Sequence, residues 1–235
     1  MKIKLNRIAK DTNLFLKNFL NKQDNSKLIP AMKYGLFPGG KKIRSKILID
    51  IGSLLPVDYK TLIIVGAAVE CIHAYSLIHD DLPCMDNDNL RRGKLTTHKK
   101  FSESTAILAG NSLLTIAFQI LSEKRLNLNE QKKIKLINLL SESSGHTGIA
   151  GGQFLDLSYE KIKKTKKQII DMQIKKTGKL FSFCCVAPII MSGKTKYLNK
   201  FNKIGNEIGL LFQIADDLID LRGKTSSAGK KTKKD

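Results

Sequence analysis

The chain has 235 residues, of which 42% are hydrophobic and only 6% are aromatic. This apolar content is enough for a substantial, mostly aliphatic core, so a generally disordered chain is excluded. The formal net charge of +20 favours an anionic partner such as nucleic acid, an anionic membrane or a phosphate-bearing small molecule. A general bias towards lysine is the better explanation of this charge for the surface as a whole.

Long segments with helical spacing of apolar residues follow one another along the chain, whereas strand and hairpin patterns are weak. The spacing predicts helices over about 3–21, 27–36, 41–54, 60–82, 102–122, 130–145, 166–191 and 197–221. Turns are expected at the proline and glycine positions 38–40, 55–56, 91–93 and 151–152. These patterns predict an all-α fold.

Neither a repeat nor a shift in composition divides the chain, so 1–235 is expected to form one domain, with a flexible basic tail over 223–235. The N-terminus lacks the features of a secretory signal. The apolar stretch 61–79 carries one acid and two histidines, so we expect a buried helix rather than membrane insertion. The four cysteines lack the spacing of a zinc site, and a reduced, cytoplasmic setting fits them best.

Acidic side chains are concentrated at the end of that helix. Four aspartates lie within nine positions, namely Asp80, Asp81, Asp86 and Asp88. Pro83 is expected to end the helix, so that the chain curls and returns Asp86 towards Asp80. Two carboxylates aimed at one point repel each other unless a cation lies between them, and Mg²⁺ is the cation that carboxylates and phosphates share. Arg91 and Arg92 follow at once and suit bidentate phosphate contacts.

A second acidic group lies in the apolar helical segment 210–221. It consists of Asp216, Asp217 and Asp220. Asp216 and Asp220 are four residues apart and share a helix face. Either acidic group alone is as typical of a solvated surface as of a site. Two groups on separate apolar helices favour a cage for metal ions and a diphosphate.

A third feature is the glycine pair Gly39–Gly40, which is followed directly by a helix with Lys41 and Arg44 in its first turns. Backbone N–H groups and basic side chains at a helix N-terminus favour anion binding. A simple basic helix cap is the more common explanation for such a pattern alone. Similarly, Gly178 after Lys176 and Thr177 is compatible with a tolerated glycine inside a helix.

Together these motifs carry a resemblance to a known family. In order they read GGKKIR, ECIHAYSLIHDDLPCMDNDNLRRG, AILAGNSLLT, GGQFLDL, KTGKL and FQIADDLID. From about residue 28 to its end, the chain resembles the trans-isoprenyl diphosphate synthases, most closely the bacterial farnesyl diphosphate synthases. The resemblance implies a bundle of long, mostly antiparallel helices around a central active-site cavity, usually in a homodimer. It implies a prenyltransferase that needs several Mg²⁺ ions.

The implied reaction condenses isopentenyl diphosphate with dimethylallyl or geranyl diphosphate through an allylic carbocation, and gives the fifteen-carbon farnesyl diphosphate. The implied catalytic residues, which clamp the metal ions and the allylic diphosphate, are Asp80, Asp81, Asp86, Asp216, Asp217 and Asp220. The metal ligands among them are Asp80, Asp86 and Asp216. The residues implied to hold isopentenyl diphosphate are Lys41, Arg44, His73 and Arg92. Those implied to hold the allylic diphosphate are Arg91, Lys176, Thr177, Gln213 and Lys230. Tyr75, five residues before Asp80, is implied to be the floor that limits product length.

The chain departs from the family pattern in places. Lys42 stands where the family usually has Arg, and Ser45 where it usually has Pro. The family also continues for several helices beyond the last motif, so we expect the chain to lack them. The alternatives are a geranyl or geranylgeranyl diphosphate synthase, a diphosphate-ionising cyclase, and a truncated, weakly active homologue acting as an interaction partner. Nucleic-acid binding is not expected, because the lysine-rich segment 161–179 lacks an aromatic platform.

Overall fold

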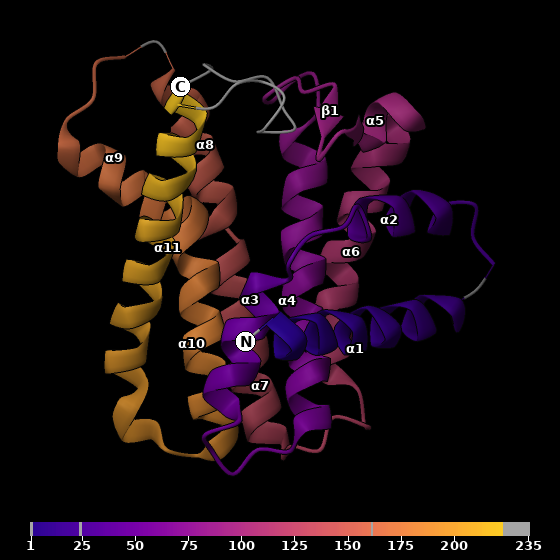
Figure 1. Ribbon diagram of the computed structural model, residues 1–235, viewed down its shortest axis with the longest axis vertical. Coiled ribbons are helices and arrows are strands. Elements are labelled where there is room, and N and C mark those ends of the chain that lie inside the picture. Colours follow the sequence, from indigo (N-terminus) through magenta and orange to yellow (C-terminus); the bar gives the residue numbers. More distant parts are fainter. Residues whose placement is uncertain (1, 24, 161, 223–235) are drawn as a thin grey trace.

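The computed structural model describes residues 2–23, 25–160 and 162–222 (Figure 1). Within these ranges the regular structure is helical apart from one antiparallel pair of two-residue strands. The elements are α1 (Lys2–Asn21), α2 (Ile29–Leu36), α3 (Ile43–Gly52), α4 (Tyr59–Asp80), β1 (Leu90–Arg91), β2 (Lys94–Leu95), α5 (Thr97–Lys100), α6 (Glu103–Ser122), α7 (Glu130–Ser144), α8 (Ile149–Tyr159), α9 (Lys166–Gln173), the π-helical turn η1 (Ile174–Gly178), α10 (Lys179–Ser192), the 3-10 turn η2 (Thr195–Tyr197) and α11 (Leu198–Arg222). The expected all-α bundle is confirmed.

Helix α4 lies at the centre of the bundle and packs against α1, α3 and α6 (Figure 1). Its start is defined by Asp58, whose carboxylate accepts a 2.9 Å hydrogen bond from the Thr61 N–H, a typical N-cap. Apolar residues of α4 occupy every face of the helix, as expected of a helix buried in a core. Helices α4 and α6 are both long and apolar enough to cross a membrane, but 83% of the apolar window of α4 is buried inside the protein.

Helix α10 forms the second centre of the core. It packs against α3, α7 and α11, and the long helices run roughly side by side while α1 lies across them (Figure 1). Large side chains of α3, α4 and α10, such as Leu48, Ile72 and Phe183, are fully buried. Each such side chain contributes about 1.5–3 kcal/mol to folding. The two helices that carry the acidic segments, α4 and α11, are therefore both anchored to this common core.

Two segments differ from the sequence-based expectation. Residues 151–152 were expected to form a turn, but they lie inside α8. A Cβ at Gly152 would approach the backbone nitrogen of Lys176 to 2.2 Å, so glycine is needed here for close packing of α8 on η1. In addition, the expected helix 166–191 is divided into α9, η1 and α10. The extra residue of a π-helical turn frequently marks a functional position.

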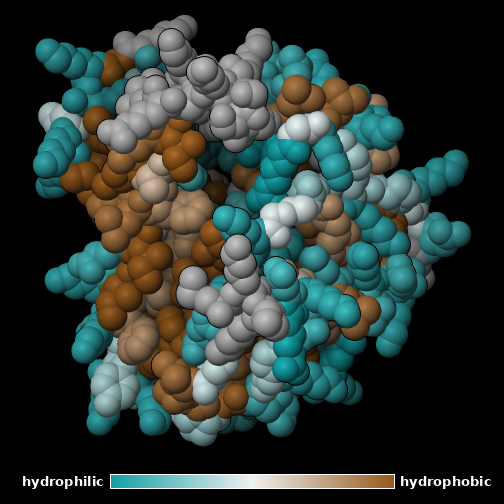
Figure 2. Space-filling view, viewed as in Figure 1, coloured by the Kyte–Doolittle hydropathy of each residue, from teal (hydrophilic) through white to brown (hydrophobic). Residues whose placement is uncertain are grey.

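Apolar side chains gather along α11 on the left of the face seen in Figure 2. Among the side chains of this helix that the structure describes, the large apolar ones that are exposed are Leu211, Ile214, Leu218 and Ile219. A stripe of this kind is usually covered by another element. The predicted tail 223–235, including Lys230, lies outside the described residues.

Candidate active site

The first acidic segment turns back on itself where α4 ends. Helix α4 ends at Asp80, and beyond Pro83 the N–H of Asp86 donates a 2.8 Å hydrogen bond to the Asp80 carbonyl oxygen. The predicted return of Asp86 towards Asp80 is thus observed. Burial raises the pKa of Asp80 to about 7, Lys176 opposes the rise, and the Asp86 carboxylate adds to it. Two carboxylates in this arrangement favour a cation between them.

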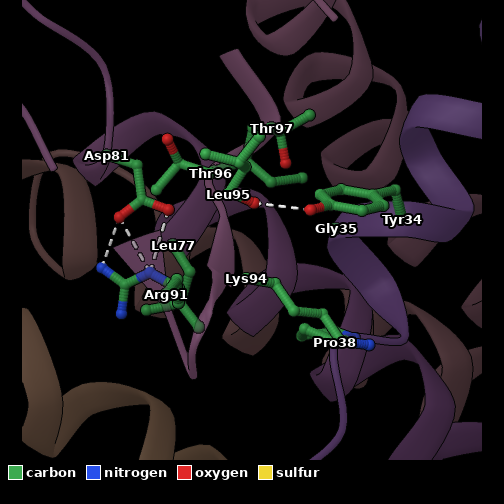
Figure 3. A pocket seen from close by; sticks show the side chains of 11 residues that line it. Tyr34, Gly35, Pro38, Leu77, Asp81, Arg91, Lys94, Leu95, Thr96 and Thr97 are labelled. Atoms are coloured by element: carbon green, nitrogen blue, oxygen red, sulfur yellow. Dashed lines mark hydrogen bonds and ion pairs between the residues drawn. The ribbon is translucent and has the colours of Figure 1, made fainter. Parts of the chain in front are cut away.

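Asp81, the second aspartate of this segment, is turned towards the β1–β2 hairpin. The Arg91 Nε donates to both Asp81 carboxylate oxygens, at 2.8 and 2.9 Å, and Nη2 lies 2.6 Å from Oδ1. Figure 3 shows this pair at one wall of a small pocket, with Tyr34 at the other. Burial raises the pKa of Asp81, and the guanidinium of Arg91 opposes that rise. Asp81 and Arg91, which were predicted to contact metal and diphosphate, therefore contact each other in this structure.

The second acidic segment is joined to the π-helical turn. Gln213 donates to Asp217 Oδ1 at 2.8 Å, and Gln173 donates to Asp217 Oδ2 at 3.1 Å. The Thr177 hydroxyl donates to Gln213 Oε1 at 3.0 Å. The structure therefore brings Thr177, Gln213 and Asp217 into one hydrogen-bonded group. Asp216 is exposed, and the side chain of Asp220 lies outside the part that the structure describes.

Lys176 connects η1 with the first acidic segment. Its Nζ lies 2.5 Å from Asp156 Oδ2 on α8. Burial acts to lower the pKa of Lys176, but the carboxylates of Asp80 and Asp156 outweigh burial and raise it. The ammonium group is therefore fixed as a cation beside Asp80, where it is suited to contact a diphosphate.

Two side chains of α8 contact this site but were not assigned a role from the sequence. Asp156 pairs with Lys176, and Gln153 Nε2 lies 3.3 Å from Asp86 Oδ1. They are three residues apart and so share a face of α8. The motif GGQFLDL indicated that this part of the chain belongs to the site. Its two glycines predicted a turn, however, and a turn does not place Gln153 and Asp156 on one helix face.

The basic residues gather around the loop before α3. Arg44 Nη1 lies 3.2 Å from His73 Nε2, and the Arg44 guanidinium stacks 4.6 Å from the centre of the Phe181 ring. Arg92 donates to the carbonyl oxygen of Gly39, and Lys41 is exposed. Burial, together with the positive charge of Arg44, lowers the pKa of His73 well below its usual value. This face combines neutral imidazole with two guanidinium groups, a donor set suited to an anion.

In the described part of the chain, the two acidic segments do not combine into one preformed metal site. Among the described residues, no three carboxylate, histidine or cysteine side chains gather closely enough to hold a metal ion by themselves. Asp80 and Asp86 nevertheless supply the oxygen ligands that Mg²⁺ prefers, and Mg²⁺ commonly takes only one or two carboxylates and completes its shell with phosphate and water. The residues present therefore fit Mg²⁺ in the presence of a diphosphate.

Known proteins share both the sequence and the fold. The family model described as polyprenyl synthetase matches residues 25–235. Farnesyl diphosphate synthase of Micrococcus luteus is 44% identical over 221 residues, which cover 93% of this chain and 75% of that enzyme. Farnesyl diphosphate synthase of Escherichia coli is 40% identical over 210 residues, 88% of this chain and 70% of that enzyme. Geranylgeranyl pyrophosphate synthase 4 of Arabidopsis thaliana is 39% identical over 87% of this chain and 56% of that protein.

Solved structures of related enzymes share the fold of this chain. An FPP/GFPP synthase from Zymomonas mobilis superimposes with a TM-score of 0.91 at 40% identity, over 95% of this chain and 81% of that one. A geranyltransferase from Helicobacter pylori, complexed with magnesium and isoprenyl diphosphate, gives a TM-score of 0.84 at 32% identity, over 98% and 80%. The fold and the two acidic segments define an all-α prenyltransferase that resembles farnesyl diphosphate synthases. The chain belongs to the polyprenyl synthetase family.

Proposed function

We propose that this polyprenyl diphosphate synthase condenses isopentenyl diphosphate with dimethylallyl and then geranyl diphosphate, and releases farnesyl diphosphate. The proposal depends above all on the return of Asp86 to Asp80 beside Lys176. This arrangement collects carboxylates for Mg²⁺ and a cation for a diphosphate at the end of one buried helix. Bound Mg²⁺ neutralises charge on the leaving diphosphate and so makes cleavage of the allylic C–O bond easier.

The protein residues then have separate tasks in the proposed reaction. The metal ligands are Asp80, Asp86 and Asp216, and the wider acidic clamp includes Asp81, Asp217 and Asp220. The allylic diphosphate is bound by Arg91, Lys176, Thr177, Gln213 and Lys230. The isopentenyl diphosphate is bound by Lys41, Arg44, His73 and Arg92. Holding the two substrates side by side in an apolar, water-excluding site lets the double bond of isopentenyl diphosphate attack the allylic carbon as the allylic diphosphate leaves. Loss of a proton from the isopentenyl unit then completes the condensation.

Tyr75 supports the fifteen-carbon product over longer ones. Tyr75 is only 8% exposed, its hydroxyl donates to the Ser144 carbonyl oxygen at 3.2 Å, and its ring lies edge-on to the His79 ring with 5.6 Å between the ring centres. A bulky side chain fixed by two contacts is suited to limit the depth of a pocket. The relatives include enzymes named for twenty-carbon products, so a geranylgeranyl product is the alternative to test.

A homodimer and a cytoplasmic location belong to the same proposal. Helix α6 presents Ile107 and Leu108 to solvent, 41% and 55% exposed, and an exposed apolar helix face favours association with a second copy. The cysteines Cys71, Cys84, Cys184 and Cys185 are free thiols, as in a reducing compartment. Neither nucleic-acid binding nor membrane insertion is part of the proposal.

The test is a product assay on the purified chain with isopentenyl diphosphate, dimethylallyl diphosphate and Mg²⁺, with chelator and a double variant, Asp80→Ala with Asp216→Ala, as controls. A fifteen-carbon product that both controls abolish supports the proposal. A ten- or twenty-carbon product would support one of the alternative synthases instead. A folded protein that makes no product and fails to bind Mg²⁺ and diphosphate together would instead favour a truncated, weakly active homologue acting as an interaction partner.

A further inference from the structure

One basic residue of the GGKKIR motif, Lys42, forms an ion pair inside the protein. Lys42 Nζ lies 3.2 Å from Glu70 Oε2, and it also donates to the Leu36 carbonyl oxygen at 3.2 Å. Both side chains of the ion pair are nearly buried, with 9% of Lys42 and 2% of Glu70 exposed. Removing one member of a buried ion pair leaves an uncompensated charge. The pair therefore holds the residue before α3 against α4.

Glu70 also contacts the backbone on the other side of Lys42. Its Oε1 accepts a 3.2 Å hydrogen bond from the N–H of Ser45 in the first turn of α3. The Ser45 hydroxyl in turn donates to the Lys42 carbonyl oxygen at 3.0 Å. One carboxylate of α4 therefore fixes both the residue before α3 and the first turn of that helix.

The backbone here needs such support. Lys42 has a φ of 49°, in the left-handed region that side chains other than glycine rarely adopt. A conformation of this kind persists only where surrounding contacts impose it. Lys41 and Arg44 both belong to the proposed isopentenyl diphosphate site. The contacts of Glu70 therefore stabilise the backbone conformation between them.

We infer that Glu70 is a positioning residue for isopentenyl diphosphate: through Lys42 and Ser45 it sets the backbone that presents Lys41 and Arg44 to the diphosphate. The inference rests on the proposed function, because it assumes that these residues bind that substrate. Both carboxylate oxygens of Glu70 contact protein groups, so its proposed role is to position other residues rather than to bind substrate. It lies on the same helix as His73, one turn away, so it also sets the distance between the loop and that imidazole.

Charge and geometry predict opposite effects when Glu70 is replaced by Gln. Removing a negative charge near an anion site should by itself tighten diphosphate binding. Loss of the ion pair with Lys42 should misplace the loop, and small displacements of binding groups cost one to two orders of magnitude. We therefore expect Glu70→Gln to bind isopentenyl diphosphate about tenfold more weakly, against the direction that charge alone predicts.

The experiment is calorimetric titration of isopentenyl diphosphate, without allylic substrate, into the full chain and its variants. Glu207→Gln is the matched control, because Glu207 makes an exposed ion pair with Lys203 at 3.9 Å, and it should bind like the unchanged protein. Lys42→Arg keeps the charge and should stay within about threefold. The paired variant Lys42→Met with Glu70→Met should fold yet bind as weakly as Glu70→Gln.

The outcomes separate the inference from the proposed function. If Glu70→Gln and the paired variant bind isopentenyl diphosphate as well as or better than the unchanged chain, the positioning role is wrong, while the product assay still stands. If the folded, unchanged chain does not bind isopentenyl diphosphate, both the site and the positioning role are refuted. Should Glu70→Gln fail to fold, the paired variant alone decides, and circular dichroism establishes its fold.

Discussion

Asp81 and Arg91 form a two-point ion pair in which Nε and Nη2 of the guanidinium both approach the same carboxylate, the shortest contact being 2.6 Å. Asp81 is nearly fully buried, with 3% of its side chain exposed, whereas 24% of the Arg91 side chain is exposed. The pair joins the end of α4 to the β1–β2 hairpin. Its first role is therefore to fix the arginine-bearing hairpin next to the first acidic segment.

Replacing Asp81 by Asn should lower the free energy of unfolding by about 3 kcal/mol, because the partly buried guanidinium loses its counter-charge. Arg91→Lys keeps the charge but not the two-point contact, and should cost about 1 kcal/mol. Urea unfolding followed by circular dichroism measures both values. Equal stability of Asp81→Asn and the unchanged protein would show that the pair does not hold the hairpin.

Replacing Tyr75 by Ala should shift the product from fifteen to at least twenty carbons, because the proposed floor of the pocket is removed. Tyr75→Phe is the matched control: it loses only the 3.2 Å hydrogen bond to the Ser144 carbonyl oxygen, and it should still release the fifteen-carbon product. Chromatography of the dephosphorylated products distinguishes the two cases. A Tyr75→Ala enzyme that stops at fifteen carbons would rule out the assignment of Tyr75 as the floor.

His73 should make stability depend on pH. Burial and the neighbouring cations lower its pKa in the folded chain, whereas the unfolded chain keeps a pKa near 6.5. Below about pH 6.5 only the unfolded chain binds this proton, so the stability that the neutral imidazole contributes is present above that pH and is lost as the pH falls. Between about pH 7.5 and about pH 5.5 the loss is about 1.4 kcal/mol.

The variant His73→Gln isolates this contribution, since all other titrating groups are shared. The stability of the unchanged protein relative to His73→Gln should therefore decrease by about 1.4 kcal/mol between those two pH values. Urea unfolding at both pH values gives the difference. A difference that stays constant with pH would mean that the imidazole is protonated equally in the folded and unfolded chain.

Gly209 should be sensitive to the addition of a single methyl group. A Cβ at this position would lie 2.5 Å from the Cα of Gly178, where α11 crosses η1. Gly209→Ala should lower the free energy of unfolding by about 2 kcal/mol through overpacking, although alanine is the better helix former. It should also weaken the Thr177–Gln213 contact and thereby reduce activity with the allylic diphosphate.

Thermal unfolding and initial rates measure both effects of Gly209→Ala. Lys203→Ala on the exposed side of the same helix is the control, and should change stability by less than about 0.5 kcal/mol. A Gly209→Ala protein as stable and active as the control would show that α11 can move away from η1 without consequence.

Sequence rules for helix ends and turns were sufficient to predict structure that depends only on contacts between residues close in the chain. Pro83 ends α4 because its ring opposes the helical carbonyl four residues earlier, and the return of Asp86 to Asp80 follows from that break. The same rules were wrong for α8. Two adjacent glycines are typical of a turn, but here a Cβ at Gly151 would collide with the His146 carbonyl oxygen and a Cβ at Gly152 with the backbone of Lys176, which explains why both occur inside a helix.

The sequence by itself determined the chemistry that this protein carries: two groups of carboxylates on apolar helices, a glycine loop with basic residues, and the order of motifs that indicates its family. Only the tertiary structure decided which charges pair with one another. Asp81 is held by Arg91, and Lys42 is held by Glu70. Side-chain periodicity relates residues within one or two helical turns, whereas these pairs depend on how separate elements pack. Burial then makes each pairing obligatory, because an unpaired charge inside the bundle would cost several kcal/mol.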